Sequence, residues 1–143
     1  MVEMVDIQGK EDTSREAVSE GFVLLGEAAL DTIRGGQTRK GDPLKTSEVA
    51  AIQAVKSTPN LIPFCHPIPL TQVTVNFEVL EDRVRCECHV SAHYKTGVEM
   101  ESLVGVSVAL LTLWDMVKYM EKDESGQYPH TRIEGIRVIS KVK

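Results

Sequence analysis

Cysteine is scarce in this sequence, with three residues among 143. The number is odd and the spacing is unlike that of secreted disulfide frameworks, so we expect reduced thiols in a cytoplasmic protein. Zinc-binding pairs of the Cys-x-x-Cys kind are also absent. His89 and His93 would lie about 13 Å apart on a strand, too far apart to share one metal ion.

Basic charge and long apolar segments are lacking as well. Lysine and arginine number 16 against 21 aspartates and glutamates, and the net charge is −5. General nucleic-acid and membrane-surface binders show a net basic face, so we expect neither kind of partner. The longest apolar stretch, residues 104–117, is interrupted by polar residues and is predicted too short to span a bilayer. A signal peptide is not expected, because the N-terminus has no basic segment followed by an apolar core.

The remaining composition is that of an ordinary soluble globular protein, with 42% hydrophobic and 26% charged residues. A chain of 143 residues fits one domain. No repeat, low-complexity tract or long linker divides the sequence, so we predict a single domain over residues 1–143.

Alternation of apolar and polar residues predicts the strands. Residues 73–79 and 84–92 alternate, and the Glu81-Asp82 turn between them predicts an antiparallel hairpin with one buried face. Residues 15–25 fit either a helix or a strand, and three apolar side chains of one parity favour the strand. Residues 131–142 alternate imperfectly and are predicted as the last strand.

Capping signals bound the first two helices. Gly35-Gly36 ends a helix over residues 26–34, because glycine adopts the left-handed cap without steric cost. Asp42 is a good N-cap and Pro43 a good first residue for the next helix, which ends before Pro59.

The longest predicted helix covers residues 98–120 and is apolar on most sides, which favours a subunit interface along it. Three prolines predict an irregular loop over residues 60–69, and the polar segment 122–129 predicts a mobile one. If the first two helices form one crossover, the element order indicates an α+β ferredoxin-like sandwich, with an antiparallel sheet and helices on one face. A fold does not supply a function.

His66 lies between two prolines, which restrict the backbone on either side. A histidine held in one orientation can act as an acid or a base near neutral pH. The alternative is an ordinary loop histidine that hydrogen-bonds the backbone, and the sequence leaves both open.

Two further clusters carry charge. Residues 95–101 run from a Lys-Thr-Gly turn into a helix start, which suits an anion, although Glu99 and Glu101 also suit ordinary dipole compensation. Asp115 and Lys118 are neighbours on one helix face. Such a pair is commonly an exposed ion pair. The residues around this pair are apolar, however, and burying a carboxylate and an amine there would cost free energy. A pair in such a place is therefore also a candidate for a functional site.

Fourteen residues separate Glu101 from Asp115 on one helix, or about 21 Å at about 1.5 Å per residue. A small reacting centre cannot contact both in one chain, so a shared site would cross a subunit boundary. Several basic residues are available for phosphate, although each could be a solvated surface side chain. They are Arg15, Lys40, Lys56, Lys95, Lys118 and Lys141.

The sequence contains two long motifs, Leu61-Ile62-Pro63-Phe64-Cys65-His66-Pro67 and Lys95-Thr96-Gly97-Val98-Glu99-Met100-Glu101. Shorter motifs are Met4-Val5-Asp6, Thr13-x-Arg15-x-Ala17, Lys40-Gly41-Asp42, Ile52-Gln53-Ala54-Val55-Lys56 and Asp115-Met116-x-Lys118. In this order and over nearly the whole chain, they resemble the cyclic pyranopterin monophosphate synthase family.

The resemblance implies a phosphorus–oxygen lyase of molybdenum cofactor biosynthesis with the same ferredoxin-like fold. The expected substrate is (8S)-3′,8-cyclo-7,8-dihydroguanosine 5′-triphosphate, which is derived from GTP. The expected products are cyclic pyranopterin monophosphate, a pterin, and diphosphate. The family implies a homohexamer built as a trimer of dimers, an active site at the dimer interface, and no metal or organic cofactor. The single domain would then be catalytic.

The resemblance also assigns roles to residues. It implies that Lys40 and Lys118 transfer protons and that Asp115 sets the charge and position of Lys118. Arg15 and Lys56 match phosphate ligands, and Lys141 matches a lysine on a mobile C-terminal segment. The expected contacts to the base and sugar are His66, Glu99, Met100 and Glu101, and Phe64 and Cys65 are also expected to bind the substrate.

Two other functions stay open. A non-catalytic nucleotide-binding or scaffold subunit could keep the pocket and lack the mobile tail. A zinc-dependent hydrolase would draw its ligands from the cysteines and histidines. Metal analysis tests the hydrolase, and turnover of the cyclised nucleotide separates an enzyme from a scaffold.

Overall fold

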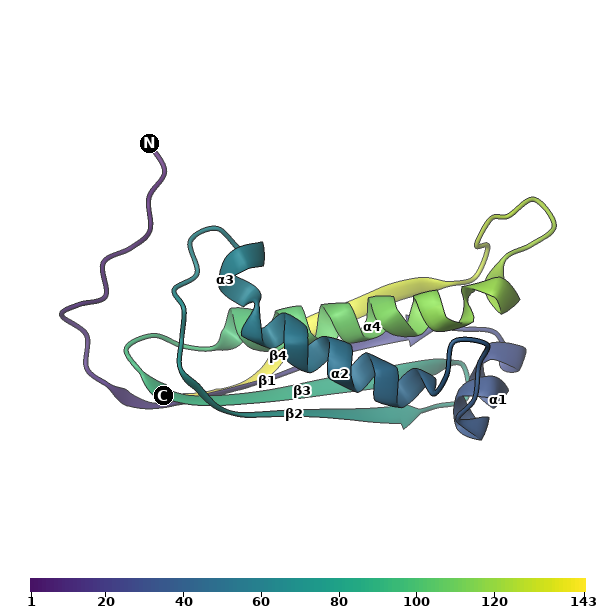
Figure 1. Cartoon of the computed structure of the whole chain (residues 1–143), viewed down its shortest axis with the longest axis horizontal. Helices are drawn as coiled ribbons and strands as arrows, with labels where there is room; N and C mark the ends of the chain where they lie inside the picture. Colours follow the sequence, from purple (N-terminus) through teal and green to yellow (C-terminus); the bar gives the residue numbers. More distant parts are fainter.

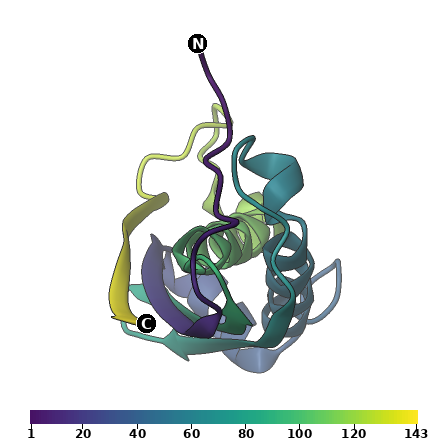
Figure 2. The same cartoon turned by 90° about the vertical axis from the view of Figure 1, so that its left-hand side faces the viewer.

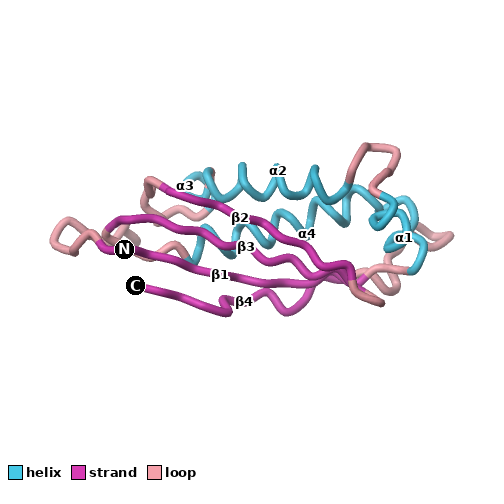
Figure 3. The backbone as a smooth tube through the Cα atoms, turned by 90° about the horizontal axis from the view of Figure 1, so that it is seen from below, coloured by secondary structure: helices cyan, strands magenta, loops and turns pink.

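The computed structural model describes all residues from 1 to 143. A four-stranded antiparallel sheet in the order β2-β3-β1-β4 carries α2 and α4 on one face (Figures 1 and 3). This confirms the predicted α+β ferredoxin-like arrangement. The elements are β1 (Thr13–Leu24), α1 (Glu27–Gly35), α2 (Pro43–Lys56), α3 (Thr58–Leu61), β2 (Leu70–Val79), β3 (Arg83–Tyr94), α4 (Glu99–Glu121) and β4 (Arg132–Val142).

The ambiguous segment at residues 15–25 is a strand, β1, and it lies in the middle of the sheet between β3 and β4. Along β3 every second side chain is buried, from Val84 to Ala92. Cys86 and Cys88 belong to this buried row, and burial raises the pKa of both thiols to about 12. Cys86 and Cys88 therefore pack as apolar core residues on the buried face of the hairpin.

α4 packs on β1, β3 and β4 and lies beside α2, which packs on β2, so α4 is the centre of the core (Figure 2). A Cβ atom at Gly105 would lie 2.6 Å from Cys88 Sγ and 2.7 Å from Val55 Cγ2. On the facing strand, a Cβ atom at Gly21 would lie 2.8 Å from side-chain atoms of α4. Glycine at these two places therefore lets the helix approach the sheet and α2 closely.

By length and composition α4 could cross a membrane, and 50% of its most apolar window is buried inside this molecule. The prediction made from residues 104–117 alone was wrong about length, because apolar positions continue beyond both ends of that stretch. The core helix of a soluble protein passes the same test of length and composition.

The helix caps agree with the sequence, but the proline-rich loop begins later than predicted. Gly36 takes the left-handed conformation after α1, and Asp42 accepts hydrogen bonds from the first turn of α2. Residues 58–61 form the short helix α3, so the prediction of an irregular loop from residue 60 was wrong by two residues. The Thr58 hydroxyl bonds the carbonyls of the preceding turn, and proline is tolerated at a helix start.

The face of the sheet that the helices leave uncovered carries a charged network. Glu20 is 6% exposed and lies under two arginines from the neighbouring strands. Its carboxylate accepts hydrogen bonds from Arg137 Nε at 2.7 Å and Arg85 Nε at 2.9 Å. The hydrogen bond from Arg137 is the main cause that lowers the pKa of Glu20, and the bond from Arg85 adds to it.

Candidate functional site

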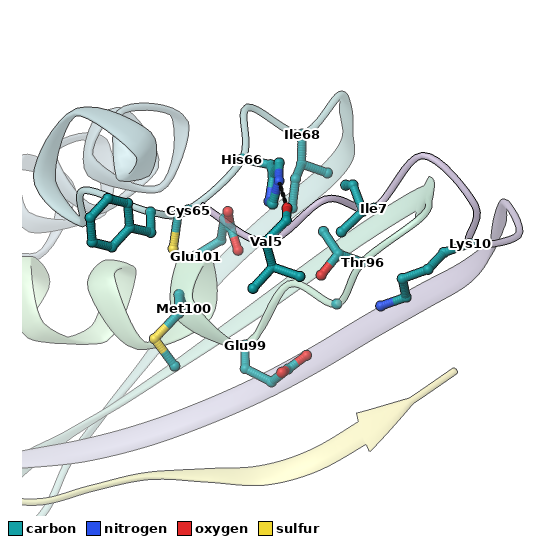
Figure 4. Close-up of a pocket in the computed structure, with 12 residues that line it drawn as sticks. Val5, Ile7, Lys10, Cys65, His66, Ile68, Thr96, Glu99, Met100 and Glu101 are labelled. Carbon is teal, nitrogen blue, oxygen red and sulfur yellow. Dashed lines mark hydrogen bonds between the residues drawn. The ribbon is translucent and has the colours of Figure 1, made fainter. Parts of the chain in front are cut away.

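The proline-rich loop and the first turn of α4 meet in one pocket of about 350 Å³ (Figure 4). Six residues that the sequence assigned to substrate contact line it together, three from the loop and three from the helix. They are Phe64, Cys65, His66, Glu99, Met100 and Glu101. The other lining residues are Val5, Ile7, Lys10, Ile68, Thr96 and Gly97.

His66 joins the loop to the N-terminal arm, residues 1–12. Its Nε2 lies 2.7 Å from the carbonyl oxygen of Val5, shown as the dashed line in Figure 4. A carbonyl only accepts, so Nε2 carries the proton and Nδ1 is the free acceptor of the neutral ring. His66 thus bonds the backbone, as the alternative interpretation expected, and it lines the pocket as well.

The pocket contains two carboxyl groups in different environments. Glu101 is 3% exposed, and burial is the main cause that raises its pKa, with a smaller contribution from Glu99. Glu99 Oε1 is buried without a hydrogen-bond partner. Glu99 Oε2 lies 3.4 Å from Lys141 Nζ, which places this C-terminal lysine beside the pocket of its own chain. This oxygen lacks the donor that a buried carboxylate normally has.

The predicted proton-transfer residues gather elsewhere, towards the end of α4. Lys40 Nζ lies 2.8 Å from Asp115 Oδ2, and Lys118 Nζ lies 3.0 Å from Asp115 Oδ1. Hydrogen bonds from the two lysines, that of Lys40 first, hold the pKa of Asp115 below its usual range. The bond to Asp115 raises the pKa of Lys118 above its usual range. The contact with Asp115 therefore favours the charged form of Lys118 and makes the ammonium hold its proton more tightly.

Of the two interpretations that the sequence left open for Asp115 and Lys118, the single chain shows the exposed ion pair and not a pair buried in an apolar stripe. The exposed fractions of the side chains are 44% for Lys40, 53% for Asp115 and 43% for Lys118. All three side chains lie at the surface of the single chain.

The pocket and the lysine cluster lie far apart in one chain. Both contain residues of the continuous helix α4, and Glu101 and Asp115 are separated along it by about 21 Å. The helix surface between them is apolar and incompletely covered. Met100 and Leu111 are exposed there, and Val104 and Val108 are half-buried. In a single chain an apolar stripe of α4 therefore separates the pocket from the lysine cluster.

The two predicted phosphate ligands flank the pocket. Arg15 is buried, and its Nε and Nη2 each donate to a backbone carbonyl at 3.2 Å, of Tyr94 and Lys95. Arg15 lines a hollow with Lys10, Glu11, Thr13 and Lys143. Lys56 lines a hollow with Ile68, which also lines the pocket, and Leu70.

The part of the pocket formed by the N-terminal arm was not predicted from the sequence. Val5, Ile7 and Lys10 of the N-terminal arm line it, and Lys10 also faces the hollow of Arg15. The signal was present, because Met4-Val5-Asp6 is one of the recognised motifs, but no local pattern connected the arm to His66. No group of three or more His, Cys, Asp or Glu side chains is arranged to hold a metal.

Comparison with known proteins adds a further observation. A family model described as the MoaC family matches residues 4–143. A probable cyclic pyranopterin monophosphate synthase of Thermococcus onnurineus is 55% identical over 142 residues, which cover 99% of this chain and 91% of that protein. Similar proteins of the same description occur in Pyrococcus abyssi, with 55% identity over 99% of this chain and 89% of that protein, and Archaeoglobus fulgidus, with 51% identity over 99% and 91%.

Proposed function

The chain belongs to the MoaC family, and from this premise we propose that it is a cyclic pyranopterin monophosphate synthase. It converts (8S)-3′,8-cyclo-7,8-dihydroguanosine 5′-triphosphate to cyclic pyranopterin monophosphate and diphosphate in molybdenum cofactor biosynthesis. It is thus an enzyme, a phosphorus–oxygen lyase. The observation that carries the proposal is the convergence of six motif residues in one pocket, in a chain that is 51–55% identical to such synthases.

The chemistry of the pocket suits the base and sugar of this substrate. Glu99 presents a buried oxygen without a partner, which suits the N–H groups of a guanine-derived ring. Glu101 takes up a proton more readily than an exposed glutamate, because burial disfavours its charged form. His66 keeps Nδ1 free as an acceptor while Nε2 is engaged.

The lysine cluster suits the proton transfers. Opening the ring aminal, forming the pterin and closing the cyclic phosphate all move protons. Lys118 supplies one as a charged ammonium, and Asp115 sets its position and charge. Lys40 is the second proton-transfer group. Departure of diphosphate needs positive charge where negative charge develops, and we assign this role to Arg15 and Lys56, with Lys141 beside the base.

We further propose that one reaction uses the pocket of one subunit and the lysines of another. In a two-fold dimer the same surface patch of both subunits is in contact. If that patch is a stripe, the residues at one end of it lie against the residues at the other end of the partner's stripe. An antiparallel meeting of two α4 stripes would bring each pocket to the partner's lysine cluster. It would also cover Leu111, which is 57% exposed in the single chain. A trimer of such dimers gives the expected hexamer.

The remaining parts of the proposal concern the domain, its location, its cofactors and its partners. Residues 1–143 act as a single catalytic domain in the cytoplasm. The synthase uses no metal or organic cofactor, and nucleic acid and membrane are not among its partners. These statements rest on the family and on the acidic composition of the chain.

Turnover of the cyclised nucleotide tests the function. The purified protein is incubated with the substrate, diphosphate is measured, and the product is oxidised to a fluorescent pterin. We expect both signals from the natural protein and neither from Lys118→Ala. Lys45→Ala removes an exposed lysine of α2 and is the matched control, with full activity expected. A folded oligomer that produces neither diphosphate nor pterin would refute the proposal.

A further inference from the structure

Lys40 lies on a tight turn between α1 and α2, beside the C-terminal part of α4 (Figure 1). Thr38 and Gly41 exchange backbone hydrogen bonds at 2.8 and 3.2 Å, and the Thr38 hydroxyl bonds both the carbonyl of Gly41 and the amide of Lys40. Gly41 has φ 118, a region that other residues rarely adopt. The turn is thus rigid within itself, but these bonds do not fix its place against α4.

Two side chains of the turn contact α4. Lys40 Nζ bonds the carboxylate of Asp115 at 2.8 Å and its carbonyl at 3.1 Å. The guanidinium carbon of Arg39 lies 4.6 Å from the ring centroid of Tyr119. Asp115 and Tyr119 are four residues apart on the helix, so the two contacts lie side by side on one face.

The two contacts respond differently to catalysis. The Lys40–Asp115 pair is half-exposed, and pairs of this kind contribute little to stability. Lys40 must also exchange Asp115 for the substrate when it transfers a proton. Arg39 stays charged throughout, since a guanidinium does not deprotonate in proteins, and its contact with the ring is independent of the reacting proton.

We propose that Arg39 and Tyr119 are positioning residues that hold the Thr38–Gly41 turn on α4, so that Lys40 stays at the reaction centre when it leaves Asp115. The proposal rests on the proposed function, because it takes Lys40 as a proton-transfer group. Neither residue touches the reacting atoms. They act through the backbone of the turn.

The test replaces the ring. In Tyr119→Leu the cation–π contact is lost, and we expect kcat to fall between about 2-fold and 30-fold, the range that corresponds to a contact of this kind. KM stays within about 2-fold, because Tyr119 is not among the residues that line the pocket. Tyr119→Phe keeps the ring face and restores kcat. The double variant Arg39→Gln with Tyr119→Leu is no slower than the slower single variant.

Arg34→Gln is the matched control, since Arg34 is exposed at the same end of the molecule but bonds Asp31 and the carbonyl of Leu80. It keeps full kcat. An unchanged kcat in Tyr119→Leu, or a loss that Tyr119→Phe does not rescue, would overturn the positioning role. If the natural protein is active and the Tyr119 variants give one of these results, only the positioning role fails and the proposed function still holds. If the natural protein is inactive, the proposed function itself is refuted.

A second measurement does not depend on turnover. NMR relaxation of the Arg39 Nε–H group reports how tightly the guanidinium is held. We expect a restricted side chain in the natural protein and in Tyr119→Phe, and a mobile one in Tyr119→Leu. Equal mobility of Arg39 in all three proteins would also overturn the proposal.

Discussion

Individual carboxyl groups of this protein differ in how readily they bind a proton, and their neighbours decide the difference. Burial raises the pKa of Glu101, whereas hydrogen bonds from Lys40 and Lys118 lower that of Asp115. Lys118 gains proton affinity from the same contact. These opposite shifts favour the protonated form of Glu101 in the pocket and the charged form of Asp115 in the lysine cluster.

Removal of the Lys118 amine should abolish catalysis without unfolding the protein. We expect Lys118→Ala to lower kcat by about 100-fold or more, the usual range for loss of a general acid or base. Its half-exposed side chain pairs with Asp115 alone, so the melting temperature should barely change. Lys118→Arg keeps the charge and serves as the control for proton transfer. An undiminished rate in Lys118→Ala would exclude Lys118 from the mechanism.

The Glu20 network predicts a dependence of stability on acid. Arg137, and then Arg85, lower the pKa of Glu20 in the folded state below its ordinary 4.5. This stabilisation is present above the unfolded value and is lost as pH falls through the folded value. Urea denaturation of Glu20→Gln from about pH 5 to about pH 3 should therefore show a shallower decline in the free energy of unfolding than the natural protein shows.

Glu124→Gln, in the exposed segment after α4, is the control for that measurement and should follow the natural protein. Identical acid profiles for Glu20→Gln and the natural protein would show that this network does not contribute to acid sensitivity.

At the scale of elements, α4 has three tasks. Its inner face packs on the sheet and on α2, its first turn closes the pocket, and its last turns hold Asp115 and Lys118. The packing must be close, because a Cβ atom at Gly105 would fall on Cys88 and Val55. Any shift of the helix would move the pocket and the lysine cluster together.

Gly105→Ala should destabilise the fold. The new methyl group meets two buried side chains at 2.6 and 2.7 Å, and overpacking of a filled core costs about 1–3 kcal/mol. Gly35→Ala is the control, because nothing lies within 4 Å of its added Cβ atom, and alanine favours a helix. Denaturant midpoints compare the two variants. Equal stability of Gly105→Ala and the natural protein would show that the helix shifts without cost.

At the scale of the whole molecule, the apolar stripe of α4 separates the pocket from the lysine cluster, which we propose to be the two halves of one site. An assembled site would therefore be shared, and inactive variants with defects in different halves should complement each other. His66→Ala damages the pocket, and Lys118→Ala damages the cluster. Mixed dimers of the two contain one site made entirely of natural residues.

Mixing the two inactive variants in equal amounts, after subunit exchange, should restore about a quarter of the natural rate, because half of the dimers are mixed and half of their sites are intact. Either variant alone stays inactive, and two variants in the same half, Lys118→Ala and Lys40→Ala, do not complement. A mixture as inactive as its components would show that each chain works alone.

Local patterns in the sequence were enough to predict most elements. Alternation marked β2 and β3, and glycine, aspartate and proline marked the ends of α1 and α2. These signals act within a few residues, so they need no knowledge of the fold. The motif resemblance, also a property of the sequence, grouped the loop at residues 61–67 with residues 95–101, and these segments do meet in one pocket.

Tertiary structure alone decided the other contacts. The sequence could not show that Val5 binds His66, that Lys40 meets Asp115 across 75 residues, or that Arg39 lies over Tyr119. Nor could it show that the lysine cluster is exposed, or that the guanidinium of Arg15 already donates a hydrogen bond to a backbone carbonyl. Such contacts depend on how whole elements pack, and packing joins residues whose separation along the chain carries no local signal.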